Sequence, residues 1–230
     1  MHEVSDKSDL RGRLLAAKSG LRERLLAVRR DMAVADRAAA DAAIRAAATD
    51  LLRTGRRVGV PAVRDARRTV TGYVPTDLEP GGRELPTALL RWGDRVLLPV
   101  LRSDLDLDWA EYTGPECLQP ARWRLCEPAG PRLGPGAASR AAVLFVPALA
   151  VDRHGNRLGR GGGSYDRALS RVPRRAQVVA LLYDGELVDA VPAEPHDRPV
   201  NAVITPTGGF VRIGVSTPPP RVDETARHGG

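Results

Sequence analysis

Apolar side chains near the amino end of the chain recur at steps of three and four residues, a spacing typical of a helix. The positions that follow this spacing are Leu14, Leu21, Leu25, Val28 and Met32. We therefore expect helical structure from about residue 10 to residue 52, interrupted near Val34. The second part is the alanine-rich run 35–53, which ends before Gly55, a residue that favours helix ends.

Short apolar runs follow, separated by loops and by short helical patterns. The runs that predict strands are 69–74, 95–100, 142–149, 177–183 and 201–205. Helices are expected at 84–93, closed by Gly93, and at 164–172. Nearly continuous apolar strands that alternate with helices indicate a mostly parallel sheet covered on both faces. The fold class predicted is therefore α/β, a three-layer sandwich with N-terminal helices.

The length of 230 residues suits one domain of this class, with or without a smaller subdomain. We expect a flexible N-terminus at residues 1–9, one folded α/β domain at 10–215 and a disordered tail at 216–230. The segment 105–139 is rich in proline and glycine and too long for a plain connection, so it is interpreted as a lid or an excursion over the site.

Composition narrows the possible partners. The formal net charge is +7, but the arginines are spread along the chain and aromatic residues make up only 4%. Nucleic-acid-binding surfaces usually combine basic with stacking aromatic residues, so a small acidic substrate fits better. No apolar run is long enough to span a membrane and no signal segment precedes the first helix, so we expect a cytoplasmic protein. Cys117 and Cys126 have no metal-binding spacing and are expected to be reduced thiols.

The stretch "NRLGRGGGSYDRAL", residues 156–169, places four glycines and two arginines between an apolar strand and a helix. It is neither a Walker A loop nor a G-x-G-x-x-G fingerprint. A loop that leaves the carboxyl end of a buried strand, carries cations and enters a helix is suited to bind an anion such as phosphate. The alternative is a flexible surface loop, with Asp166 serving only as a helix-starting acid.

A second polar cluster, "VPAEPHDRPVNAVIT", precedes the last predicted strand and contains Asp197. The histidine spacing argues against zinc, whereas Asp166 and Asp197 together suit a hard cation such as Mg²⁺. On the first helix, Lys18 and Arg22 belong to a cationic face that also includes Arg29 and Arg30. This face is either solvated or in contact with the bound anion.

These residues resemble the 5-formyltetrahydrofolate cyclo-ligase family, also called methenyltetrahydrofolate synthetase. The resemblance rests on "VPALAVDRHGNRLGRGGGSYDRAL" and "LVDAVPAEPHDRPVNAVIT", with "KSGLRERLLAVRR" and "GYVPTDLEPG…RVLLPV" in the right order, and covers about residues 18–207. It implies that the protein uses ATP to convert 5-formyltetrahydrofolate, a reduced folate, into 5,10-methenyltetrahydrofolate, with release of ADP and phosphate.

The resemblance also implies roles for particular residues. ATP would be bound by Lys18, Arg22, Arg157, Leu158, Gly159, Arg160, Gly161, Gly162, Gly163, Ser164 and Tyr165. The folate would contact Glu79, Arg160, Gly161, Gly162, Gly163 and Ser164. Arg160 and Tyr165 would be catalytic, Arg160 as the cation that stabilises the transition state, and Asp166 and Asp197 would hold Mg²⁺.

Three positions depart from the family pattern. Ser164 replaces a tyrosine, Gly162 stands where some members have lysine, and Asn201 replaces an aspartate, which predicts weaker Mg²⁺ binding. None of the three removes an indispensable residue. An alternative function of another class is a nucleotide- or phosphate-binding protein that has lost the folate reaction and acts as a sensor or partner subunit. A basic RNA-binding accessory protein is a third possibility. We expect a monomer or a weak homodimer.

Overall fold

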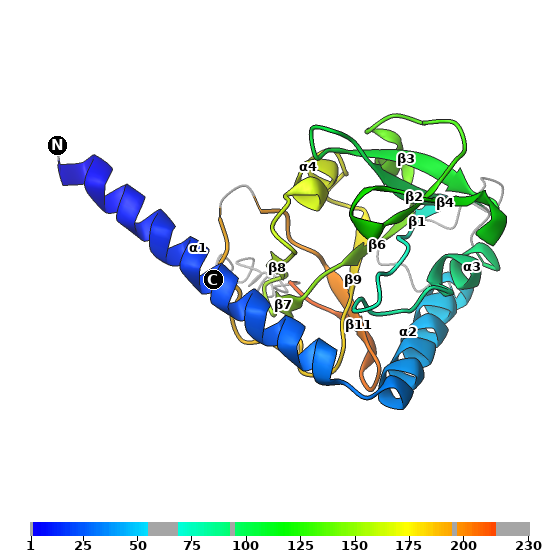
Figure 1. Cartoon of the computed structure of the whole chain (residues 1–230), viewed down its shortest axis with the longest axis horizontal. Helices are drawn as coiled ribbons and strands as arrows, with labels where there is room; N and C mark the ends of the chain where they lie inside the picture. Colours follow the sequence, from blue (N-terminus) through cyan, green and yellow to red (C-terminus); the bar gives the residue numbers. More distant parts are fainter. Residues whose placement is uncertain (1, 55–68, 93–94, 195–196, 215–230) are drawn as a thin grey trace, which may run out of the picture.

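The computed structural model describes residues 2–54, 69–92, 95–194 and 197–214 (Figure 1). Its helices are α1 (His2–Asp31), α2 (Val34–Thr54), α3 (Leu85–Leu90) and α4 (Ser164–Ser170), with short 3₁₀ turns η1 (Pro115–Cys117), η2 (Arg122–Arg124) and η3 (Ala137–Arg140). Its strands are β1 (Thr69–Thr71), β2 (Arg95–Leu101), β3 (Leu107–Tyr112), β4 (Leu118–Pro120), β5 (Cys126–Pro128), β6 (Val143–Pro147), β7 (Ala150–Asp152), β8 (Arg157–Leu158), β9 (Gln177–Leu181), β10 (Leu187–Val188), β11 (Ala202–Thr205) and β12 (Gly209–Arg212).

The central sheet has seven strands in the order β12-β11-β9-β6-β1-β2-β3. The five inner strands, which are the five that the sequence predicts, run parallel to one another. The edge strands β3 and β12 run antiparallel to their neighbours, and the sequence analysis missed both. The predicted mostly parallel sheet is thus confirmed, with four of the five strands shorter than expected and an antiparallel strand at each edge.

Both faces of the sheet are buried, because successive residues of each inner strand pack into different layers. In β6, Val143 and Phe145 belong to the core that packs against α2 and α3, whereas Leu144 and Val146 belong to the core beside α4. This alternation explains the nearly continuous apolar runs. The three-layer α/β sandwich is therefore confirmed.

The N-terminal helices lie where the sequence expects them, with a break before Val34. The second half of α1 packs against a small sheet of order β10-β7-β8, and its first half projects from the body (Figure 1). The helix begins at His2, within the segment 1–9 predicted to be flexible. The predicted helix end at Gly93 and the tail 216–230 lie outside the described residues.

The strand order determines where a ligand can bind. The chain passes from β1 through α3 to β2 on one side of β1, and β6 lies on its other side. In open α/β sheets, the crevice at the carboxyl ends of strands beside such a reversal is the usual ligand site. The segments that leave β1 and β6 are those that contain Glu79 and, through β7 and β8, the glycine loop.

Candidate active site

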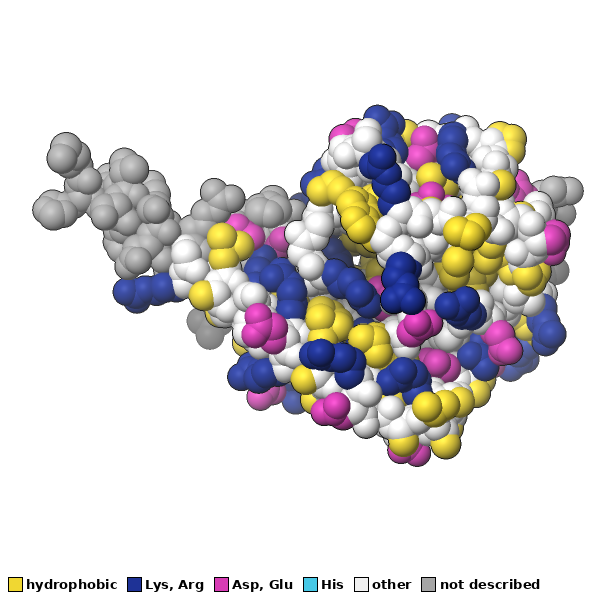
Figure 2. Space-filling model, viewed as in Figure 1, with side chains coloured by type: hydrophobic (Ala, Val, Ile, Leu, Met, Phe, Trp, Pro, Cys, Tyr) yellow, Lys and Arg dark blue, Asp and Glu magenta, His cyan; other side chains and the backbone are white. Residues whose placement is uncertain are grey.

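A cavity of about 610 Å³ lies at this edge of the sheet. All the residues to which the sequence analysis assigned site roles line it: Lys18, Arg22, Glu79, Arg157, Leu158, Gly159, Arg160, Gly161, Gly162, Gly163, Ser164, Tyr165, Asp166 and Asp197. Figure 2 shows Lys and Arg side chains gathered around a hollow on this face of the molecule. Four segments that are distant in the sequence therefore meet in one cavity.

The glycine loop, residues 159–163, forms one wall of this cavity. Gly161 and Gly163 have φ angles of +103° and +67°, in the left-handed region that favours glycine. Gly163 immediately precedes α4, so the second of these turns directs the chain into the helix. A side chain at Gly159 would lie 2.7 Å from the Arg157 guanidinium. The glycines thus allow a tight loop and the close approach of a cation.

Lys18 and Arg22 project from α1 toward this loop and toward the cluster around Asp197. The Lys18 ammonium lies 2.8 Å from Oδ2 of Asp197 and 3.0 Å from Oε2 of Glu194, and only 6% of the residue is exposed. Arg22 Nε donates to the Gly159 carbonyl over 2.8 Å. The interpretation of this face as merely solvated is therefore wrong for both residues.

The pKa of Lys18 reflects two opposing effects. Burial alone would lower it, but the hydrogen bonds to Asp197 and Glu194 outweigh burial and raise the pKa above its ordinary value. Lys18 is therefore a permanent cation in this site at neutral pH.

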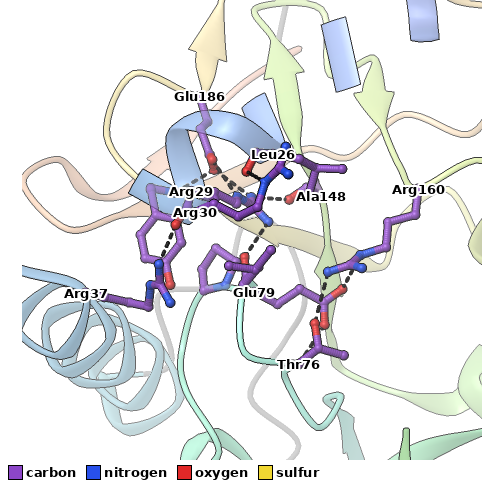
Figure 3. A network of polar contacts seen from close by, with 12 residues as sticks. Leu26, Arg29, Arg30, Arg37, Thr76, Glu79, Ala148, Arg160 and Glu186 are labelled. Carbon is purple, nitrogen blue, oxygen red and sulfur yellow. Dashed lines mark hydrogen bonds and ion pairs between the residues drawn. The ribbon is translucent and has the colours of Figure 1, made fainter. Parts of the chain in front are cut away.

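Arg160 is the cation at the mouth of the cavity. Its Nε lies 3.2 Å from Oε1 of Glu79, and its Nη2 donates to Oγ1 of Thr76 over 3.0 Å (Figure 3). The Thr76 backbone N–H donates to the other oxygen of Glu79. The Arg160 side chain is 49% exposed, so it can exchange these partners for a ligand without being moved out of the core.

Arg157, Tyr165 and Asp166 form the floor beside the glycine loop. Arg157 Nη2 lies 2.9 Å from Oδ1 of Asp166, and its guanidinium carbon lies 5.9 Å from the centre of the Tyr165 ring. Burial raises the pKa of Tyr165 well above its ordinary value, so its phenol stays protonated. Its hydroxyl is buried and makes no hydrogen bond to any described residue, which leaves a donor available to a ligand.

The comparisons with known proteins bear on this constellation of residues. The model of the 5-formyltetrahydrofolate cyclo-ligase family matches residues 14–206. The chain belongs to this family. A 5-formyltetrahydrofolate cyclo-ligase of Mycolicibacterium smegmatis is 48% identical over 151 residues, which cover 64% of this chain and 77% of the relative. The enzyme of the same name from Escherichia coli is 37% identical over 142 residues, or 60% of this chain and 78% of the relative.

Solved structures of this family share the fold. The 5,10-methenyltetrahydrofolate synthetase of Aquifex aeolicus matches with a TM-score of 0.66 at 23% identity, covering 91% of this chain and 99% of its own. The synthetase of Mycoplasma pneumoniae matches with a TM-score of 0.59 at 18% identity, covering 81% of this chain and 96% of its own. The predicted family and its three-layer α/β fold are confirmed.

One of the departures from the family pattern does not lie where the sequence analysis expected it. Asn201 accepts a hydrogen bond from the Val178 N–H over 2.9 Å and donates to the Ala176 carbonyl over 2.8 Å. Both ends of the amide thus join the start of β11 to the start of β9. The Asn201 side chain is thus used in the sheet and is not among the residues that line the cavity, so its position lends no support to the expectation of weaker Mg²⁺ binding.

The sequence analysis predicted that the segment 105–139 lies over the site, but it did not predict which of its residues form the apolar wall of the cavity. The segment 105–139, interpreted as a lid or an excursion, contributes Leu105, Leu107, Trp123 and Leu125 to the lining. The same segment also contains edge strand β3 and the hairpin β4–β5, so it is partly sheet. Its length and composition were the only signals that it belonged to the site.

Glu194 was also missed as a partner of Lys18. No role was predicted for Glu194, whereas its carboxylate and that of Asp197 contact the same ammonium. Within the described residues, no group of three or more His, Cys, Asp or Glu side chains is arranged to hold a metal.

None of the described helices combines the length and the apolar character that a membrane-spanning segment requires.

Proposed function

We propose that this chain closes the ring of 5-formyltetrahydrofolate to give 5,10-methenyltetrahydrofolate, consuming ATP and releasing ADP and phosphate. The observation that supports it is a single cavity in which a glycine loop and four cations face an apolar wall. The cations suit a triphosphate and the apolar wall suits the flat ring of a folate. Family membership adds the reaction that would use both.

The first step activates the formyl oxygen, which is a poor leaving group. This oxygen attacks the γ-phosphorus of ATP, an O–P bond forms, and the bond to the β-phosphate oxygen breaks to release ADP. Such transfers depend on positioning and on neutralising charge. Lys18 and Arg22 hold the phosphates, while Arg160 stabilises the charge that develops on the phosphoryl group.

The second step closes the ring. The neighbouring folate amine attacks the activated carbon, a C–N bond forms, and the amine proton passes to the departing phosphate. The C–O bond then breaks, and inorganic phosphate leaves with the former formyl oxygen. Glu79 orients the folate ring, and the protonated hydroxyl of Tyr165 donates a hydrogen bond to the oxygen that carries the phosphoryl group.

Three of the four cations of the cavity are paired with its carboxylates. Lys18 pairs with Asp197, Arg157 with Asp166, and Arg160 with Glu79. Binding then exchanges partners: phosphate oxygens take over the cations, and the carboxylates become available to other ligands.

The donor set suits Mg²⁺ in a particular way. Mg²⁺ is commonly held by one or two carboxylates together with substrate phosphates and water, and the cavity offers Asp166 and Asp197 without an all-protein cage. These two residues would hold the ion. When bound, it would neutralise phosphate charge during transfer.

The test measures methenyl-folate formation by absorbance together with ADP release. We expect product and ADP in equal amounts, dependent on ATP, Mg²⁺ and 5-formyltetrahydrofolate. A matched control is R53A, which removes an arginine from an exposed pair on α2 and should leave turnover unchanged. ATP binding without product would favour the phosphate-binding alternative, and salt-sensitive RNA binding would favour the third possibility. Light scattering tests the expected monomer or weak homodimer.

A further inference from the structure

Arg29 is the most deeply buried charged residue of the described chain and does not line the cavity. It lies near the end of α1, and its exposed fraction is 0%. Its Nε and Nη2 lie 2.7 Å from the two carboxylate oxygens of Glu186 (Figure 3). Glu186 in turn accepts the backbone N–H of Tyr183 over 2.8 Å. The pair is bidentate and almost wholly removed from solvent.

The remaining donors of Arg29 hold the backbone of two other segments. Nη1 donates to the Leu78 carbonyl over 3.0 Å, and Nη2 also donates to the Ala148 carbonyl over 2.6 Å. Leu78 follows β1, Ala148 follows β6, and Glu186 follows β9, and these three strands are neighbours in the sheet. One guanidinium therefore joins α1 to the segments that leave the carboxyl ends of three adjacent strands.

Two of these connections lead directly to the cavity. Lys18 and Arg22 lie eleven and seven residues before Arg29 in α1, spacings that place all three on one face of the helix. Leu78 is the neighbour of Glu79, which pairs with Arg160. The position of Arg29 thus sets both the height of the α1 cations over the cavity and the position of Glu79.

Stability alone does not explain this arrangement. A buried ion pair is often no more stabilising than apolar residues of similar size, because both charges must be removed from water. What the pair adds is geometry, since a planar guanidinium fixes several acceptors at once, whereas a lysine ammonium is a point charge. Here the Arg29 guanidinium fixes four acceptors from three segments, namely the two carboxylate oxygens of Glu186 and the carbonyls of Leu78 and Ala148.

We propose that Arg29 and Glu186 are a positioning pair that fixes α1 and the Glu79 segment around the substrate cavity. This inference rests on the proposed function for its ligands, ATP and the reduced folate. Arg29 touches neither ligand and acts through Lys18, Arg22 and Glu79.

The test uses R29K. The lysine keeps a cation beside Glu186, but its single ammonium group cannot also donate to the Leu78 and Ala148 carbonyls. We expect KM for ATP and for 5-formyltetrahydrofolate to rise together, with kcat/KM about tenfold to a hundredfold lower and kcat changed less. The matched control is R95K, which makes the same change in the Arg95–Glu111 pair at the opposite end of the sheet. Its KM values should equal those of the wild type.

A second variant separates positioning from folding. R29M/E186M replaces the pair by apolar side chains and leaves no unpaired charge, although the Leu78 and Ala148 carbonyls lose a donor. We expect a folded protein with raised KM values that is destabilised less than E186Q, which leaves the Arg29 charge without its carboxylate. Wild-type KM values in a folded R29M/E186M, or in R29K, would overturn the proposal. Calorimetric Kd values for ATP, measured without turnover, should rise in both variants. If the wild type makes no methenyl product, the proposed function fails, and the ATP Kd still decides whether Arg29 positions the site.

Discussion

Two arginine–glutamate pairs meet at neighbouring residues of one loop, because Arg29 donates to the Leu78 carbonyl and Arg160 pairs with Glu79. The Arg29–Glu186 and Arg160–Glu79 pairs, both visible in Figure 3, have the same chemistry but differ in burial. The Arg29–Glu186 pair is 2.7 Å long, with side chains 1% and 5% exposed. The Arg160–Glu79 pair is 3.2 Å long, and its side chains are 49% and 11% exposed. The first holds its partners in a place that no ligand reaches, whereas the second lies where a ligand can replace one partner.

The difference shows how burial decides what an ion pair does. A buried charge that loses its partner is left unsolvated, so the pair is fixed for as long as the protein is folded. At an exposed site, water replaces the lost partner at little cost, so the pair can open and close. Residues that act on a substrate are therefore expected in pairs that solvent can reach, such as Arg160–Glu79. A buried pair such as Arg29–Glu186 is expected to hold their surroundings in place.

The largest expected effect comes from breaking the buried pair on one side. E186Q leaves the Arg29 charge without a carboxylate and should lower the free energy of unfolding by about 3–5 kcal/mol. E79Q, the same change in the pair whose arginine is half exposed, should lower it by less, because water around Arg160 can replace the lost partner. Urea unfolding of both variants measures the difference. Equal losses would mean that burial does not distinguish the two pairs.

The next effect concerns catalysis, for which the more exposed Arg160–Glu79 pair matters more than the buried Arg29–Glu186 pair. R160A should lower kcat by about a hundredfold to a thousandfold, because its positive charge is needed where charge develops during phosphoryl transfer. Its free energy of unfolding should stay close to that of the wild type. Single-turnover kinetics with saturating substrates check this expectation, and an unchanged rate would assign Arg160 to the surface.

Asp166 tests whether a carboxylate paired with an arginine also serves the metal. D166N should lower kcat at least about tenfold, or roughly 1.4 kcal/mol, and increase the Mg²⁺ concentration needed for half-maximal activity. The measurement is a magnesium titration of both proteins. Full activity at ordinary Mg²⁺ would limit Asp166 to its contact with Arg157.

On α1, the expected effect is on nucleotide binding. K18A and R22A should raise KM for ATP about tenfold and KM for the folate by less, since each removes a contact to phosphate. Initial rates at varied concentrations of each substrate separate the two constants. An equal rise in both would instead resemble R29K and indicate that Lys18 and Arg22 position the cavity.

The sequence predicts the fold well where a pattern is continuous. Val143, Leu144, Phe145 and Val146 are all buried, and such a run has few explanations other than an inner strand. Strand β3 was missed because Asp108 and Glu111 interrupt its apolar residues, as suits an edge strand. The strands of the small sheet are only two or three residues long and carry no period that a pattern could reveal.

The site could be predicted only where its chemistry is local. The glycine loop places its cations, its turns and Asp166 within a dozen residues, so the sequence displays them together. The partners of Lys18 and Arg29 lie 176 and 157 residues away, and nothing in the spacing connects Glu194 or Glu186 with α1. Arg29 was recognised only as part of a cationic face, although it is the residue of that face with no exposure.

The smallest expected effect concerns a third pair, intermediate between the first two. Arg171, the residue that follows α4, holds Asp106 through two hydrogen bonds of 3.0 and 2.6 Å, with side chains 38% and 11% exposed. The hydrogen bond from Arg171 holds the pKa of Asp106 below its ordinary value, although burial opposes this shift. A depressed pKa means that the pair stabilises the fold above the unfolded pKa of about 3.9, and that this contribution is lost as the pH falls through the folded pKa.

D106N should therefore lower the free energy of unfolding by about 1 kcal/mol at pH 7, a limit set by solvent around Arg171. The difference from the wild type should shrink below about pH 4 and vanish once Asp106 is protonated in both states. Urea unfolding of both proteins between pH 7 and pH 3 measures this convergence. A difference that stays constant with pH would show that the amide disturbs packing and that the charge of Asp106 contributes nothing. That result would place the Arg171–Asp106 pair with Arg160–Glu79, as a contact whose opening costs the fold little.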